Sequence, residues 1–514
     1  MLWSDSLWTT LLILTVVIAL LCVYLSSVNN YWKRLGVPCV KSELLFGSAR
    51  RALFAQESLP TCIQRIYQEL GDVPFGGFYL MMTPCLMVKD VGLINKILVS
   101  DFAHFTDRIS PLSTKMEPLA KHLFCLGGDL WREMRLYMSS AFSDSSCRRD
   151  FCLVRLCCDR LQQSVHAAFQ GRHSRDLRLT DLLAAFTTDV IGMCAFGIEC
   201  GAIDDPNSQF RRIGSMILPN TKKKASSALL VLTLPRIGSF FGVKFFSTTV
   251  REFFDRIVME TIDYRKKNNI HREDLVQLML ELKDGGIISG KNGEAIEVTD
   301  NLVVAQMMMA FTMGFEMTSS AMSFCLHELS LNPAMQTLAR KEVDAVLARH
   351  GGEVTYEAIQ EMTYLDMLIA ETLRLYPMQM YMMRQCTKTY QVPGSDLVLQ
   401  KGTMVYLPVL SLQRDPRFYP DPLRFDPQRF ANCKGDVVDA PYWPFGEGPR
   451  ACLGQKFALM VVKAGLVALL SRFEFRPCLR SSGRPADFEP HSFLARPAGG
   501  LWVRVSLRPW LPLQ

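Results

Sequence analysis

An apolar run without a charged side chain extends from Leu7 to Leu25. A helix of about 20 residues, rising roughly 1.5 Å per residue, crosses a hydrocarbon core of about 30 Å. Asp5 precedes the run, whereas Lys33, Arg34 and Lys41 follow it. Basic residues mark the cytoplasmic side of a membrane helix. The pattern therefore predicts a membrane anchor with the rest of the chain in the cytoplasm. A cleaved signal peptide is the competing interpretation, but it requires basic residues before a shorter apolar run.

Further along the chain, the pattern is mainly that of helices with several short strands. Residues 306–330 form a long, largely apolar stretch of helical length, and residues 455–470 have a helix-like pattern. Residues 229–246 contain two Phe-Phe pairs. This segment is either an apolar connection that dips into a bilayer or a pair of buried helices, and both interpretations stay open.

The length of 514 residues predicts about three domains, but no linker or internal repeat divides the chain. We therefore expect a membrane anchor over residues 1–30, a hinge over residues 31–50 with aromatic rings at headgroup level, and one large domain over residues 51–514. A net charge of +7 is modest for this length and gives no indication of nucleic-acid binding. The 16 cysteines have neither a disulfide-framework spacing nor a zinc-site spacing.

The most informative motif is a glycine-rich loop around Cys452, Pro444-Phe445-Gly446-Glu447-Gly448-Pro449-Arg450-Ala451-Cys452-Leu453-Gly454. Glycines let a backbone approach a flat ligand closely, and a cysteine can present a thiolate to a metal. The alternative is that Cys452 is an ordinary buried cysteine. The loop resembles the haem-binding signature of the cytochrome P450 monooxygenases, which implies that Cys452 is the axial ligand of haem iron. Phe445, Gly446, Gly448, Arg450 and Gly454 are the other residues of that signature.

Two further motifs resemble this family in order and spacing. Glu371 and Arg374 are three residues apart, so they lie on one face of a helix and can pair. Arg429, within Pro427-Gln428-Arg429-Phe430, matches the second arginine of the family's buried Glu-Arg-Arg network. The resemblance gives this network a structural role. Breaking it would leave a buried charge unpaired, at a cost of several kcal/mol.

The resemblance also implies which residues hold the haem propionates. Trp131 and Arg135 lie in a segment similar to the family's propionate-binding helix, and the planar guanidinium suits a carboxylate. The haem contacts that it implies are Trp131, Arg135, Gly314, Arg384, Phe445, Gly446, Gly448, Arg450, Cys452 and Gly454.

The segment from Met313 to Ser319 resembles the family's oxygen-binding helix but departs from it at one position. In the family an acid is followed directly by a threonine, whereas here Met317 separates Glu316 from Thr318. A thioether cannot donate a proton, and one helical position turns a side chain by roughly 100°. We expect Glu316, with ordered water, to support oxygen activation while more peroxide is released. The competing interpretation is that the helix distorts and Thr318 takes the missing position. Glu316, Thr318 and Cys452 are the catalytic candidates.

Long stretches, including Phe105-Thr106-Asp107-Arg108, resemble the insect microsomal family six. The resemblance implies a mainly α fold with a small β lobe. It also implies a haem b cofactor, electrons from NADPH through a flavoprotein reductase, and oxidation of small lipophilic compounds. Partners would be the reductase, a cytochrome b-type donor and the endoplasmic reticulum membrane, with the catalytic domain on its cytoplasmic face. Residues 110–124 would form a lid over the haem. The candidate pocket residues are Met313, Phe315, Met317, Met378, Met380, Met382 and Phe493.

Two other functions stay open. A haem isomerase or dehydratase of lipid peroxides needs neither a reductase nor a proton relay, so the loss of the threonine would be harmless to it. A non-catalytic haem protein at the membrane is the second alternative.

Overall fold

The computed structural model is mainly helical, and its described residues form four small sheets. It describes residues 2–108, 117–218, 221–234, 238, 240–290, 293, 295–431 and 440–508. The first part of the expected lid, from Ser110 to Met116, lies outside these residues. The α-helices are α1 (Leu2–Asn29), α2 (Tyr31–Arg34), α3 (Arg50–Leu53), α4 (Leu59–Glu69), α5 (Val91–Asn95), α6 (Gly128–Met138), α7 (Asp144–Ala168), α8 (Leu179–Ile191), α9 (Gln209–Ile217), α10 (Lys222–Thr233), α12 (Thr248–Asn268), α13 (Leu275–Asp284), α14 (Asp300–Leu331), α15 (Pro333–Arg349), α16 (Tyr356–Gln360), α17 (Thr363–Leu375), α18 (Val409–Gln413) and α19 (Gln455–Arg472).

Short 3-10 and π segments connect several of these helices, and the strands are equally short. The segments are η1 (Lys96–Ser100), η2 (Phe102–His104), η3 (Pro118–Ala120), η4 (Ser139–Phe142), η5 (Gly192–Phe196), η6 (Pro427–Phe430) and η7 (Gly448–Arg450). The strands are β1 (Phe75–Leu80), β2 (Thr83–Val88), β3 (Ser174–Arg178), β4 (Ile287–Ser289), β5 (Ala295–Glu297), β6 (Met382–Gln385), β7 (Tyr390–Gln391), β8 (Val398–Leu399), β9 (Met404–Leu407), β10 (Phe473–Arg476) and β11 (Trp502–Leu507).

The largest sheet joins the N-terminal and C-terminal halves of the chain in the order β1-β2-β9-β6. β2 and β9 are parallel, and the outer pairs are antiparallel. The expected hinge folds onto this sheet, since Trp32 is fully buried and its indole nitrogen donates to the carbonyl of Phe78 at 3.3 Å. The expectation that its ring lies at headgroup level is therefore wrong. A side chain on Gly77 would collide with Trp32, because an added Cβ would lie 2.2 Å from the ring.

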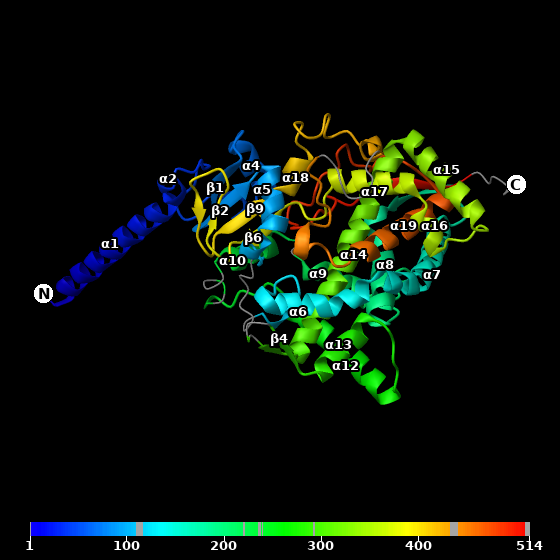
Figure 1. Cartoon of the computed structure of the whole chain (residues 1–514), viewed down its shortest axis with the longest axis horizontal. Helices are drawn as coiled ribbons and strands as arrows, with labels where there is room; N and C mark the ends of the chain where they lie inside the picture. The colour runs from blue at the N-terminus through cyan, green and yellow to red at the C-terminus, as the bar shows by residue number, and fades with distance from the viewer. Residues whose placement is uncertain are drawn as a thin grey trace.

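The central element is α14, whose side chains are almost all buried (Figure 1). It packs along α8, and α19 and α17 lie beside it. The close approach to α8 requires Gly314, because a Cβ there would lie 2.6 Å from the Ile191 side chain. Thr187 of α8 donates a hydrogen bond to the Phe315 carbonyl at 3.0 Å. These contacts hold α14 in one register over the loop that carries Cys452.

The helix α1 projects away from the folded body (Figure 1). Its segment Trp8–Asn29 has a mean hydropathy of 2.7 and is almost entirely exposed. A helix of this length and composition is a candidate membrane anchor. Within the described ranges, a second helix is long and apolar enough, Leu179–Phe196, but it is mostly buried inside the protein and belongs to the core.

Candidate haem site

The cysteine loop is shaped by glycines with left-handed backbone. Gly448 has φ +68°, and a Cβ on it would lie 2.0 Å from the carbonyl oxygen of Leu98. No other residue type fits that position without moving the backbone. The Cys452 amide donates to the Phe445 carbonyl at 2.8 Å, which closes the loop. The loop therefore presents the Cys452 sulfur directly before the start of α19.

Cys452 lies on one wall of a cavity of about 280 Å³. Phe445, Arg450 and Gly454 line the same wall, and α14 forms the facing wall with Ala310, Met313, Gly314, Met317, Thr318 and Ala321. Burial raises the pKa of the Cys452 thiol, whereas the Gly454 amide and the charges of Arg108 and Arg135 lower it. Cationic and amide donors around a sulfur favour its thiolate form.

Arg108 and Arg450 line this cavity, Arg384 adds a third positive charge close by, and the Asp107 carboxylate lies 3.8 Å from Arg450 Nη2. Arg108, Arg384 and Arg450 each keep a buried guanidinium nitrogen that has no hydrogen-bond partner, namely Nε, Nε and Nη1. Burial lowers the pKa of Arg108 to about 10 and that of Arg450 to about 9, and it lowers the pKa of Arg384 well below the usual value. The charges of the three arginines also act on one another. Buried cations are stable only when paired, so this cluster suits an anionic ligand.

The fixed parts of the cluster show where such an anion would bind. The Arg450 guanidinium lies 4.0 Å from the Trp131 ring and donates to the carbonyls of Thr106 and Leu126 at 2.9 and 2.7 Å. Arg108 donates to the Arg450 carbonyl at 2.9 Å and packs on Phe124. The remaining donors of these arginines are available to carboxylates. Arg135 also lines the cavity. Arg384, on β6, does not line it, but the charges of Arg108 and Arg450 act on its guanidinium and lower its pKa further.

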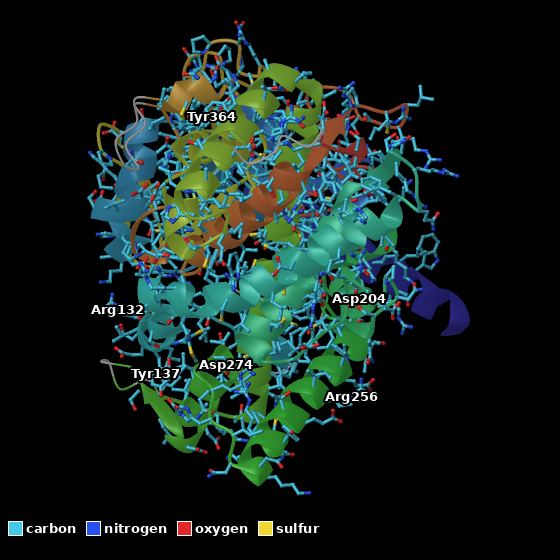
Figure 2. All side chains as sticks on the ribbon, turned by 90° about the vertical axis from the view of Figure 1, so that its right-hand side faces the viewer. Arg132, Tyr137, Asp204, Arg256, Asp274 and Tyr364 are labelled. Atoms are coloured by element: carbon cyan, nitrogen blue, oxygen red, sulfur yellow. The ribbon has the colours of Figure 1, made fainter. Side chains whose placement is uncertain are left out.

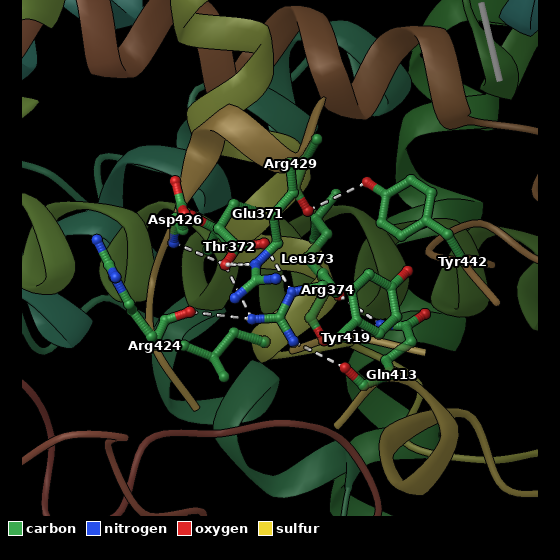
Figure 3. Close-up of polar contacts among 12 residues, drawn as sticks. Glu371, Thr372, Leu373, Arg374, Gln413, Tyr419, Arg424, Asp426, Arg429 and Tyr442 are labelled. Carbon is green, nitrogen blue, oxygen red and sulfur yellow. Dashed lines mark hydrogen bonds and ion pairs between the residues drawn. The ribbon is translucent and has the colours of Figure 1, made fainter. Parts of the chain in front are cut away.

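The three side chains of the Glu-Arg-Arg network come together in the structure (Figure 3). Arg374 makes a two-pronged ion pair with Glu371, at 2.6 and 2.8 Å, and both side chains are fully buried. Arg429 Nε lies 3.6 Å from the same carboxylate. The Asp426 amide donates to Glu371 at 2.8 Å, and Arg374 donates to the Gln413 carbonyl at 2.7 Å. The network thus ties α17 to the end of α18 and to the segment that follows α18.

The structure separates the side chains of the oxygen-binding segment onto two faces of α14. Met313, Gly314, Met317 and Thr318 line the cavity with Cys452. Glu316 lies on the other face, in a second, polar cavity of about 170 Å³, where its carboxylate pairs with Arg496 at 2.8 Å. The helix is continuous through this segment, so the alternative in which the helix distorts here is wrong.

Four of the expected pocket residues do not line the cavity that contains Cys452. Phe315 lines the second cavity and packs on Phe311, with ring centroids 5.1 Å apart. Met380 and Met382 are buried in the main core, and the Met382 sulfur faces Gly446 behind the cysteine loop. Phe493 packs against the same core. The strand β6 alternates sides and the chain turns at Met378, so of this methionine run only Met378 and its neighbour Gln379 reach the cavity.

The structure adds Arg108 and Met138, which the sequence reasoning did not place in the site. Phe124, from the expected lid, and Met309, on the helix expected to line the pocket, line the cavity as well. Arg108 belongs to the segment Phe105-Thr106-Asp107-Arg108, which resembles family six, but no pattern in the neighbouring residues indicates that its side chain turns inward.

The cavity has the donor set of a haem-thiolate site. A cysteine and an apolar helix line one cavity, and arginines with unpartnered buried nitrogens beside it could bind carboxylates. Cys452 would bind iron, and the arginine cluster with Trp131 would bind the propionates. These features define the class of haem-thiolate proteins.

The comparisons with known proteins agree with this class. The family model of cytochrome P450 matches residues 45–503. The chain is 36% identical to cytochrome P450 6a2 of Drosophila melanogaster over 96% of this chain and 99% of the relative. It is 33% identical to cytochrome P450 6k1 of Blattella germanica over 96% of each chain. The chain belongs to the cytochrome P450 family and resembles insect members of family six. It is a cytochrome P450 monooxygenase, an oxidoreductase that uses haem and takes electrons from a redox partner.

Proposed function

We propose that this enzyme inserts one oxygen atom of O2 into small lipophilic substrates, such as xenobiotics, insecticides, plant toxins or endogenous lipids. The observation that carries the proposal is the apolar, methionine-rich wall that faces Cys452, formed by Met309, Met313, Met317 and Met378. Methionine is flexible and polarisable, so this wall can repack around ligands of different shape. Bound haem would supply the oxidation chemistry, with Cys452 donating electron density to the iron.

Proton delivery is the step at which this chain departs from the family pattern, because Met317 separates Glu316 from Thr318. Met317 lines the cavity but has no proton to give, and Thr318 lines it one position later. Burial raises the pKa of Glu316, so its carboxyl holds a proton more readily than an exposed glutamate. Ser319, Ser320 and Ser323 share the second cavity with Glu316. We infer that protons reach Glu316 from this polar cavity, and that the step from Glu316 across α14 to Thr318 is the slow one.

We further propose that the electrons come from NADPH through a flavoprotein reductase, with a cytochrome b-type protein as a second donor. An acidic partner fits the exposed basic residues beside the cysteine loop, Arg132 on α6 and Lys456 on α19. Arg132→Glu should raise the reductase concentration that gives half-maximal haem reduction. Arg256→Glu on α12 is the matched control, since both side chains are exposed on different parts of the surface (Figure 2). Equal effects of the two variants would contradict docking at Arg132.

The proposed location is the endoplasmic reticulum membrane, with the catalytic domain on the cytoplasmic face. The helix α1 would be the anchor, and basic Lys33 and Arg34 follow it directly. Phe240 and Phe241 are 84% and 70% exposed. The helix α10, which precedes them, contacts α3, and Phe54 just after α3 is exposed as well. Of the two interpretations of residues 229–246, exposed aromatic rings support the one in which the segment dips into the bilayer.

Reconstitution with reductase, NADPH and a panel of lipophilic compounds tests the function. Oxygen uptake with product formation is the expected result. Conversion of a lipid hydroperoxide without NADPH would instead support an isomerase or dehydratase. A thiolate-ligated haem with neither activity would support a non-catalytic haem protein.

A further inference from the structure

The cavity that contains Cys452 extends well beyond the arginine cluster. The helix α6 runs along it, with Trp131 near the start of the helix and Met138 at its end. At about 1.5 Å per residue, these two positions lie roughly 10 Å apart along the helix axis. Ala141 and Phe142 continue the lining past the end of α6. The cavity therefore reaches a region remote from the buried arginines.

At this far end the lining becomes charged and exposed. Arg149 and Asp150 of α7 line the cavity together with Glu273 and Asp274, which precede α13. The side chains of Arg149 and Glu273 are 40% and 70% exposed. Side chains that line a cavity and also face solvent mark an opening, and Figure 2 places Asp274 between α7 and the helices around α12. We call Arg149, Asp150, Glu273 and Asp274 the charged mouth.

An ion pair spans the charged mouth. Arg149 Nη1 lies 2.6 Å from Glu273 Oε2, and this contact joins α7 to the short segment before α13. Asp274 on the same side is fixed, because Arg265 pairs with it at 2.6 Å in a buried contact. Glu273 has no such anchor and is the movable member. A surface ion pair contributes little free energy, so thermal motion opens it readily.

We propose that the charged mouth is a second opening of the haem cavity, used by small polar molecules such as water and hydrogen peroxide, with the Arg149–Glu273 pair as its gate. Lipophilic substrates would have to strip water from the exposed charges of Arg149 and Glu273 to pass, which is costly. Polar molecules lose little there, since they exchange one set of hydrogen bonds for another. The inference rests on the haem cavity and does not depend on which substrate the enzyme oxidises.

Cys194 provides a reporter for this opening. It lines the cavity near the mouth and is buried. Cys157 lies nearby, with its sulfur 3.5 Å from that of Met193, but it does not line the cavity. In the haem-loaded enzyme, a small water-soluble methanethiosulfonate should modify Cys194 through the mouth. Modification of Cys157 would instead require local unfolding. Peptide mass spectrometry resolves the two sites without any turnover.

Glu273→Ala should accelerate the modification of Cys194 about 2- to 5-fold, the factor expected for removing a surface ion pair. Salt should accelerate it in the wild type and have little effect in Glu273→Ala, because ions screen the pair. Glu353→Ala is the matched control, since it breaks the Arg155–Glu353 pair on the same helix α7, at 3.1 Å, away from the cavity.

Three results would overturn the proposal: an unchanged Cys194 rate in Glu273→Ala, an equal acceleration in Glu353→Ala, or a parallel rise at Cys157. Because the reaction needs neither NADPH nor substrate, a failure here is distinct from a failure of the proposed monooxygenation.

Discussion

At the scale of single residues, the site holds a cluster of three arginines, of which Arg450 has the Asp107 carboxylate at 3.8 Å. Arg108, Arg384 and Arg450 repel one another, and burial lowers the pKa of each. Such a group lowers stability until an anion pairs with it. The same residues that bind haem therefore work against the folded state of the haem-free protein. Haem binding and folding are coupled through these charges.

Arg108→Leu should accordingly have opposite effects on haem affinity and on the stability of the haem-free protein. Losing one charge-assisted hydrogen bond should raise the haem dissociation constant about 10-fold. The free energy of unfolding without haem should stay the same or rise. Haem titration and urea denaturation measure the two quantities. Arg132→Leu, at an exposed position on α6, is the control and should change neither quantity. If Arg108→Leu lowered both the haem affinity and the stability of the haem-free protein, Arg108 would have a merely structural role.

Met317 is the residue on which efficiency of oxygen use should depend. Met317→Thr places a hydroxyl on the cavity wall next to Thr318, so the share of consumed oxygen released as peroxide should fall several-fold. Met313→Thr is the matched control, because Met313 lines the same wall one turn earlier. The measurement is the amount of peroxide released per oxygen consumed in each variant. An unchanged share in Met317→Thr would exclude Met317 as the cause of any leak.

At the scale of elements, the Glu371 network holds α17 against the segments around it. Glu371→Gln removes the charge that Arg374 and Arg429 share, and leaves Arg374 buried without a counter-charge. The free energy of unfolding should fall by about 3–5 kcal/mol. Glu357→Gln, which breaks the exposed pair with Arg148, should cost less than about 1 kcal/mol. Urea denaturation measures both losses. Similar losses in the two variants would mean that the unpaired buried charge of Arg374 does not reduce the free energy of unfolding.

The end of α14 should make stability depend on pH. His327 is fully buried, its Nε2 lies 3.4 Å from the Gly483 carbonyl, and burial lowers its pKa to about 4. The unfolded chain, with an ordinary pKa near 6.5, binds more protons between these values. The free energy of unfolding should therefore rise with pH across this range, by up to about 1.4 kcal/mol per unit for this group.

His327→Gln should flatten this slope. Burial also lowers the pKa of His122 to about 4, so a slope from that residue should remain. His173→Gln, at an exposed position, should leave the slope as it is. Denaturation curves at several pH values measure the slope of the free energy of unfolding against pH. An unaltered slope in His327→Gln would mean that His327 does not cause this pH dependence.

At the scale of the whole molecule, membrane association should come from two separate surfaces. Removing residues 1–29 deletes the exposed apolar helix α1 but leaves Phe240 and Phe241. The truncated protein should still bind vesicles, more weakly and reversibly, since a few exposed rings bury far less apolar area than a spanning helix. Adding Phe240→Ser and Phe241→Ser should release it. Vesicle flotation measures both steps, and full release by truncation alone would remove the second surface.

The sequence by itself determined the features that depend on local order. The backbone conformation of the Cys452 loop requires glycines, which can be read in the sequence. Helical spacing brings Glu371 and Arg374 onto one face of a helix. The apolar composition of α1 predicts a membrane anchor. The mainly α fold followed from these motifs through their resemblance to the family. None of these features depends on which distant segment is packed nearby.

Only the tertiary structure decided which way side chains face across the core. Glu316 and Met317 are neighbours in sequence, yet they line different cavities, because α14 has protein on every side and no polar face in its pattern reveals the site. Trp32 is buried by a strand that lies far along the chain. The inward turn of Arg108 and the charged mouth both arise where segments without a shared sequence pattern meet, and long-range packing alone sets such contacts.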